Sequence, residues 1–244
     1  SKILEFTKKE HLYLKNKKLI NLCVDPNWLP YAKVKNGKYI GIGGDIIEIM
    51  KSKLPISIKL VNTKSWKETL EFAKQRKCDI VDFAIQTQKR DTYLNFTSQY
   101  VKIPLVMATK LNATFIINFK NLQNKKIGIV KDYAFAELLK NKYPNLDLVE
   151  VETISAGLDK VKDNELFGYV GAFAAVAHEF NYNFTGELKI SGLFDESMQM
   201  GLAVRNDDKV LFEIMEKIIS NIHKEEISKI ISKWITRRYE KEFD

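Results

Sequence analysis

The sequence has few of the residues that mark whole classes of protein. Its 11 glycines and 5 prolines exclude a collagen-like repeat, and a hydrophobic content of 45% excludes a disordered chain. No uncharged apolar run reaches the ~18 residues that a membrane-spanning helix needs. A globular chain of 244 residues fits one large domain or two lobes of about 100–150 residues each.

Metal-binding patterns are also missing. The two cysteines, Cys23 and Cys78, fit no metal spacing, and His11, His178 and His223 lie apart, so we expect no metal and no cofactor. Cys23 is expected near the far end of one strand and Cys78 before the start of another. That placement disfavours a disulfide between them.

Arginine is scarce, although the formal net charge is +8. Arginine occurs at only five positions, so single lysines interleaved with acidic residues carry nearly all of the excess charge. Surfaces that follow phosphates usually cluster their basic residues and favour the guanidinium group. The composition therefore indicates a solvated lysine-rich surface and no nucleic-acid partner.

The chain begins at Ser1 rather than at Met, without a charged segment followed by an apolar one. We therefore expect a processed form or an excised fragment, with any signal peptide or membrane anchor outside it.

Two similar segments of alternating strands and helices fill most of the sequence. The predicted strands cover 19–24, 56–61 and 79–85 in the first segment and 126–130, 147–151 and 167–171 in the second. Each segment reads β-α-β-α-β, which predicts a small, mainly parallel sheet flanked by helices. Extended stretches at 103–109 and 200–204 would form two hinge crossings between the resulting lobes.

These patterns predict an α/β protein with two lobes. We expect a lead-in over 1–18, a first lobe formed by 19–106 together with 204–244, and a second lobe formed by 107–203. Ligands of open α/β sheets lie at the carboxyl ends of the strands. Two such lobes on a hinge would therefore hold a ligand in a cleft and close around it.

Aromatic and acidic residues follow the first predicted strand. Asp25, Trp28 and Tyr31 emerge where a ligand would lie, and aromatic rings supply apolar walls for a small organic molecule. The alternative is a rigid loop whose rings only cover the core.

The third predicted strand ends at Ile85 and leads into Thr87 and Arg90. A guanidinium group recognises a carboxylate through two parallel hydrogen bonds, and a threonine hydroxyl can donate to the same oxygens. The alternative is a surface arginine paired with Asp91 or Glu71.

Two further turns lead into predicted helices. Free backbone N–H groups after the strand 126–130 could bind an anionic group at Tyr133 and Ala134, while Asp132 is expected to cap the helix. The segment 41–45 is glycine-rich but does not follow a core strand, so it is interpreted as a turn into a helix that Asp45 opens.

The order of these motifs resembles the family 3 bacterial solute-binding proteins. The resemblance covers about residues 19–236 and rests on the segments 25–31, 41–45, Trp66, 79–80, 87–90 and 95–100. It implies the two-lobed Venus-flytrap (type II periplasmic-binding-protein) fold. Details at Phe6–Glu10, Lys131–Ala134 and Phe194–Ser197 are similar to extracytoplasmic sensor domains of bacterial histidine kinases.

The resemblance also implies roles for individual residues. Arg90 and Thr87 would clamp a ligand carboxylate, Trp66 would add a ring to the pocket, and Tyr133 with Ala134 would form the anion-binding helix start. The family's amino-acid binders carry an aspartate where this sequence has Ala172, which puts capture of an ordinary α-amino acid in doubt. Asp82, inside an apolar strand, would either replace that carboxylate or face a solvated edge. The full predicted ligand-binding set is Asp25, Trp28, Tyr31, Trp66, Asp82, Ile85, Thr87, Arg90, Tyr133, Ala134 and Ala172.

We therefore expect a non-enzymatic ligand-binding domain of a membrane signalling protein such as a histidine kinase. It would lie outside the cytoplasm, as part of an inner-membrane protein, with membrane segments outside this chain and dimerisation of the full-length protein left open. Its partner would be a small carboxylate or amino-acid-like solute. One alternative is the soluble receptor of an ABC importer, and a less favoured one is a cleft dehydratase that uses Asp25 or Asp82 as acid or base.

Overall fold

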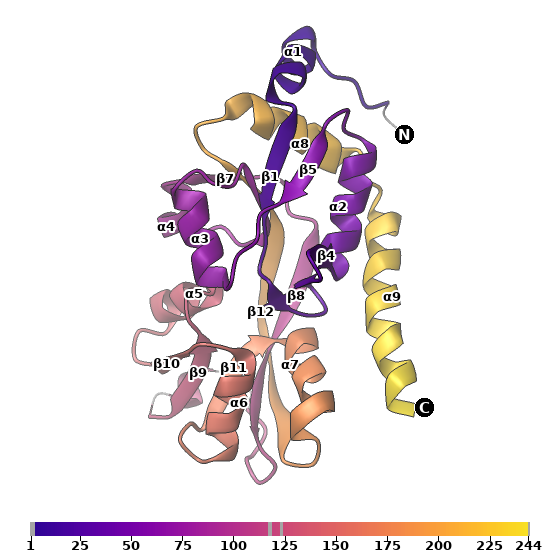
Figure 1. Cartoon of the computed structure of the whole chain (residues 1–244). Helices are drawn as coiled ribbons and strands as arrows, with labels where there is room; N and C mark the ends of the chain where they lie inside the picture. The colour runs from indigo at the N-terminus through magenta and orange to yellow at the C-terminus, as the bar shows by residue number, and fades with distance from the viewer. Residues whose placement is uncertain (1–2, 117–118, 123, 244) are drawn as a thin grey trace. The chain divides into compact units, whose positions relative to one another are not determined.

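The chain folds into two compact units. The computed structural model describes residues 3–116, 119–122 and 124–243, without the side chains of 182, 195, 196 and 236–243. Unit 1 contains Ser1–Val101 and Gln199–Asp244, and unit 2 contains Lys102–Met198. Two long strands, β8 (Val101–Lys110) and β12 (Leu188–Arg205), carry the chain between the units (Figure 1). The prediction of two extended crossings is therefore confirmed.

Unit 1 is built on a sheet of five strands. They are β1 (Leu19–Cys23), β5 (Ser57–Leu60), β6 (Ile80–Ala84), β7 (Leu94–Phe96) and the C-terminal part of β12. The order is β5-β1-β6-β12-β7, with β1 parallel to both β5 and β6, and β12 antiparallel to its two neighbours. Because β1 and β6 are parallel neighbours, their carboxyl ends lie at one edge of the sheet.

The helices of unit 1 pack on this sheet and on one another. They are α1 (Lys8–Lys17), α2 (Ile42–Ser52), α3 (Trp66–Lys74), α4 (Gln88–Asp91), α8 (Lys209–Ser220) and α9 (Lys224–Phe243). In α8 the buried residues are Leu211, Ile214, Met215, Ile218 and Ile219, a spacing that places them on one face. Asp208 begins α8 by accepting a hydrogen bond from the Leu211 N–H. None of the described helices is both long enough and apolar enough to cross a bilayer.

A small antiparallel sheet follows β1. It contains β2 (Asn27–Trp28), β3 (Ala32–Lys35) and β4 (Lys38–Ile40), which pair in sequence order. Asn36 and Gly37 both have positive φ in the tight turn between β3 and β4, a conformation that asparagine and glycine tolerate best.

The prediction that Asp45 opens the helix α2 is wrong. The helix begins at Ile42, its N-cap is Gly41, and Asp45 lies inside the first turn. Gly41 has φ of +106°, and a Cβ there would lie 2.8 Å from the Pro30 carbonyl oxygen. Glycine is required at this position, so the helix starts four residues earlier than the Asp45 pattern indicates.

The prediction against a disulfide is also wrong, because Cys23 and Cys78 form one, with Cα atoms 5.7 Å apart. Cys23 does end β1, and Cys78 does precede β6. However, the Asp79 N–H donates to the Asn21 carbonyl, and the Asp79 carboxylate accepts from the Asn21 N–H. This pair of hydrogen bonds draws the segment before β6 alongside β1 and brings the two sulfur atoms together.

Unit 2 repeats the α/β arrangement. Its elements are η1 (Phe119–Leu122), β9 (Lys126–Val130), α5 (Ala134–Lys142), β10 (Asp147–Val151), α6 (Ile154–Lys162), β11 (Gly168–Ala172), α7 (Phe173–Glu179), η2 (Phe180–Phe184) and parts of β8 and β12. The strands run in the order β10-β9-β11-β8, with β9 parallel to β10 and β11, and β11 antiparallel to β8. The strands predicted at 126–130 and 147–151 have the observed bounds.

Asp132 does not cap α5, contrary to expectation. The N-cap is Tyr133, which makes no capping hydrogen bond through its side chain, and Asp132 has a φ of +65° in the preceding turn. Aspartate tolerates this left-handed conformation better than most residues. Asp132 therefore forms the turn, and the helix begins two residues later.

Candidate functional site

The segment after β1 places one acidic and two aromatic side chains together. Asp25, Trp28 and Tyr31 are all buried, and the Asp25 carboxylate accepts a hydrogen bond of 3.0 Å from the Asn27 N–H. The rings of Trp28 and Tyr31 lie 4.7 Å apart between centroids. The predicted grouping of these residues therefore exists in unit 1. Their contact with a ligand stays a prediction.

The segment that follows β6 places Arg90 next to Ile85, Thr87 and Trp66. Its guanidinium donates from Nη1 to the Ile85 carbonyl at 2.8 Å and lies 5.4 Å from the centre of the Trp66 ring. Thr87 is the N-cap of α4, and its hydroxyl accepts from the Arg90 N–H at 3.1 Å. Arg90 is only 4% exposed, so the surface position that the alternative gave it is wrong.

This arrangement suits an anionic ligand. The charged end of Arg90 is a guanidinium group. The group carries five N–H donors in a planar fork that matches the two oxygens of a carboxylate. The Trp66 face supports the cation without neutralising it. A carboxylate at Arg90 would therefore gain charge-assisted hydrogen bonds that water does not match.

A second buried acid, Asp82, lies within β6 itself. Asp82 is 1% exposed and accepts hydrogen bonds from the hydroxyls of Tyr39, at 2.7 Å, and Tyr100. Burial raises the pKa of Asp82 to about 6, although the hydrogen bonds from Tyr100 and Tyr39 lower it. We call these three residues the Asp82 cluster. The alternative of a solvated edge is wrong, because β6 lies between β1 and β12.

A β-bulge adjoins the Asp82 cluster. The pairing of β6 with β12 shifts register between Gly201 and Ala203, and Phe83 has a φ of +51°. A bulky residue in this conformation is strained, and such strain often accompanies binding sites. The Phe83 ring lies 6.3 Å from Tyr31 and 6.1 Å from Tyr100, between centroids. The bulge was not predicted, since phenylalanine in an apolar strand gives no signal for it.

Unit 2 contributes the remaining predicted residues. Tyr133 is the N-cap of α5 and Ala134 its first residue, and the Tyr133 N–H donates to the Val130 carbonyl at 3.3 Å. The start of a helix favours anions, so their contact with a ligand stays a prediction. Ala172 ends β11, serves as the N-cap of α7 and is buried. It supplies no carboxylate where amino-acid binders would have one. In this unit the predicted recognition therefore relies on backbone groups and small side chains.

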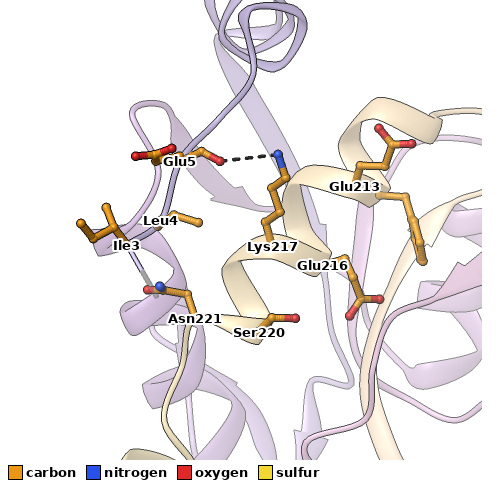
Figure 2. Close-up of a pocket in the computed structure, with 9 residues that line it drawn as sticks. Ile3, Leu4, Glu5, Glu213, Glu216, Lys217, Ser220 and Asn221 are labelled. Atoms are coloured by element: carbon orange, nitrogen blue, oxygen red, sulfur yellow. Dashed lines mark hydrogen bonds between the residues drawn. The ribbon is translucent and has the colours of Figure 1, made fainter. Parts of the chain in front are cut away.

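A surface hollow lies elsewhere in unit 1 (Figure 2). Its volume is ≈ 460 Å³, and it is lined by Ile3, Leu4, Glu5, Phe212, Glu213, Glu216, Lys217, Ser220 and Asn221. Lys217 links the lead-in to α8, because its Nζ donates to the Glu5 carbonyl at 3.5 Å and to the Glu10 carboxylate. None of the predicted ligand-binding residues belongs to this lining.

Within residues 3–116, 119–122 and 124–243, no three His, Cys, Asp or Glu side chains gather as metal ligands would. The similarity predicted at Phe194–Ser197 includes Asp195 and Glu196, whose side chains lie outside the described residues.

Curated relatives match almost the whole chain. The virulence sensor protein BvgS of Bordetella pertussis is 18% identical over 231 residues, which are 94% of this chain and 19% of BvgS. The sensor protein EvgS of Escherichia coli K12 is 23% identical over 239 residues, 96% of this chain and 20% of EvgS. The chain therefore spans about a fifth of the length of these relatives.

Solved structures share the fold. The periplasmic VFT2 domain of Bordetella pertussis BvgS has a TM-score of 0.85 at 18% identity, over 95% of this chain and all of that domain. An ancestral arginine-binding protein bound to arginine has a TM-score of 0.76 at 19% identity, over 89% of this chain and 98% of that protein. These likenesses confirm the predicted Venus-flytrap fold.

A family model matches residues 20–237, nearly the range over which the sequence motifs indicated a resemblance. The match covers both units and the segments after β1 and β6 that hold the candidate site. The chain belongs to the bacterial extracellular solute-binding proteins, family 3.

Proposed function

We propose that this chain is the ligand-binding sensor domain of a bacterial membrane signalling protein such as a histidine kinase. Its ligand is a small carboxylate or amino-acid-like solute. The observation that carries the proposal is the buried Arg90, held beside Thr87 and the Trp66 ring at the end of β6. The relatives BvgS and EvgS, whose names describe sensors, support the signalling role.

Recognition would begin with the ligand carboxylate. Arg90 donates two parallel hydrogen bonds to its oxygens, and the Thr87 hydroxyl donates a third. Trp28 and Trp66 supply apolar walls, and the N–H groups at the start of α5 attract a second anionic group. Ligand binding favours the conformation that binds more tightly, and this difference in affinity is the signal. No catalytic step is needed.

The family and the disulfide both support a location outside the cytoplasm. The family is extracellular, and the Cys23–Cys78 disulfide persists in an oxidising compartment. We propose that the domain lies in the periplasm, as the name of the related BvgS structure describes for that domain. We also propose that it is part of an inner-membrane protein.

A second function uses identical binding chemistry. The likeness to an arginine-binding protein, over 98% of that protein, favours a soluble receptor that delivers its ligand to an importer. The sequence that flanks this chain in its gene separates the two functions, because a sensor continues into membrane and kinase segments.

A thermal-shift screen tests the proposal. The probes are L-arginine, dicarboxylates and aromatic acids, each beside a counterpart without the carboxylate, such as agmatine for L-arginine. We expect the melting temperature to rise with one or more acids and to stay unchanged with their counterparts. Arg90→Ala should remove the rise. A rise that persists in Arg90→Ala, or that counterparts reproduce, would contradict the proposal.

A further inference from the structure

The first turn of α2, Gly41–Asp45, holds the loop that carries the aromatic residues of the candidate site. The N–H of Ile42 donates to the Pro30 carbonyl, and the N–H of Gly43 donates to the Tyr31 carbonyl, both at 2.8 Å. These are N–H groups that a helix leaves without partners of its own. Movement of the loop at Pro30 and Tyr31 therefore pulls directly on the start of α2.

The same turn packs against the Asp82 cluster and the bulge. A Cβ on Gly43 would lie 1.9 Å from the Tyr39 Oη and 2.3 Å from the Phe83 ring. A Cβ on Gly44 would lie 2.5 Å from the Tyr39 carbonyl oxygen. No methyl group fits between these parts, and packing this dense transmits displacement instead of absorbing it.

The last residue of the turn binds the C-terminal helix. Asp45 accepts a hydrogen bond of 2.8 Å from the Trp234 Nε1–H, and the Lys233 Nζ lies 3.6 Å from the same carboxylate oxygen. The helix α9 runs alongside α2 (Figure 1). A carboxylate in the first turn of a helix is also stabilised by the helix dipole. Asp45 is therefore stabilised both by its own helix, α2, and by its partners on α9.

We propose that the first turn of α2 couples the candidate site to α9 through the Asp45–Trp234 hydrogen bond. A shift of the 25–31 loop or of the bulge at Phe83 moves this turn, and Asp45 moves with it. The docking of α9 then changes. Coupling between two sites is reciprocal, so altered docking of α9 must also alter the loop. That a ligand drives the shift rests on the proposed function, whereas the coupling itself requires no ligand.

Indole NMR signals measure this coupling. The chain has three tryptophans, so 15N-labelled protein gives three indole N–H cross-peaks, which single Trp→Phe variants assign. Tyr39→Phe removes a hydroxyl that donates to Asp82. We expect it to shift the Trp234 cross-peak and to accelerate exchange of that indole hydrogen about tenfold. In the reverse direction, Trp234→Phe deletes the donor to Asp45 and should shift the Trp28 cross-peak.

Tyr13→Phe is the matched control. Tyr13 lies on α1 and donates to Asp208, so the variant breaks the same kind of pair in the same unit, away from the first turn of α2. It should leave the Trp234 signal in place. A Trp234 signal that ignores Tyr39→Phe, or responds equally to both variants, overturns the proposal. If Tyr39→Phe does not fold, an unshifted Trp28 signal in Trp234→Phe overturns it. Both measurements use the protein without a ligand, so a failure to bind carboxylates would be a result separate from the coupling.

Discussion

The two units carry different chemical groups at the ends of their strands. Unit 1 supplies a buried guanidinium, a buried carboxylate and aromatic rings, at Arg90, Asp25, Trp28 and Trp66. Unit 2 supplies the backbone at the start of α5 and the methyl groups of Ala134 and Ala172. Side chains can be exchanged by single substitutions, and backbone N–H groups cannot. We therefore infer that unit 1 determines ligand specificity, and that substitutions there have the larger effects.

The largest expected effect separates Arg90 from Tyr133. Arg90→Ala removes the charge-assisted partner of the ligand carboxylate, a loss of about 3 kcal/mol or more for two such bonds, which is over 100-fold in affinity. Tyr133→Ala leaves the N–H groups of α5 in place, so we expect less than about a tenfold loss. Calorimetry with an acid found in the screen measures both. Equal losses would contradict the comparison.

Removing the disulfide should weaken unit 1 selectively. Cys23 and Cys78 are 55 residues apart in sequence and both buried, and unit 2 contains no cysteine. The double variant Cys23→Ala, Cys78→Ala should lose about 2–5 kcal/mol in the free energy of unfolding of unit 1. Hydrogen exchange should show faster opening of β1 and β6, with β9 and β10 unchanged. Uniform loss of protection in both units would mean that they unfold together.

Gly43→Ala and Gly157→Ala compare two crowded helices. Alanine normally stabilises a helix interior relative to glycine. Here the new Cβ atoms would lie 2.3 Å from the Phe83 ring and 2.6 Å from the Tyr169 ring, so each variant should lose about 1–3 kcal/mol. Urea unfolding measures this loss. We expect only Gly43→Ala to shift the Trp28 indole signal. A shift of the same signal in Gly157→Ala would contradict the distinction between the two units.

The smallest effect concerns pH. The pKa of Asp82 is raised by burial to about 6 in the folded protein, above 3.8 for the ordinary carboxyl group. The folded state therefore binds this proton more tightly, so the contribution of Asp82 to stability grows as pH falls through 6 towards 3.8. From pH 7 to pH 5 the gain is about 1 kcal/mol. Urea unfolding of Asp82→Asn, which does not titrate, should lack this gain. An identical pH dependence in both proteins would remove Asp82 as its source.

The strands β6, β9 and β11 were visible in the sequence because burial on both faces leaves largely apolar runs. Lys126–Val130 and Asp147–Val151 have the predicted bounds. The wrong predictions concern places where backbone conformation or backbone hydrogen bonds determine the structure. Gly41, not Asp45, begins α2, because close approach to Pro30 demands glycine. Long-range hydrogen bonds of Asp79 bring the cysteines together, and a local sequence pattern does not reveal such bonds.

In the candidate site, too, some features could be predicted from the sequence and others could not. Arg90 stood out because arginine is scarce, and its burial confirmed that it is not a surface residue. The tyrosine partners of Asp82 come from β4 and from the residue that precedes β8, 43 and 18 positions away in sequence. No local pattern of residues predicts these pairings or the β-bulge at Phe83. Tertiary contacts of this kind require the structure.

The most direct measurement is a crystal structure of the protein with an acid that the thermal screen identifies. We expect the ligand carboxylate to lie within hydrogen-bonding distance of the Arg90 guanidinium and the Thr87 hydroxyl. A ligand bound elsewhere, or one whose carboxylate lies away from Arg90, would contradict it.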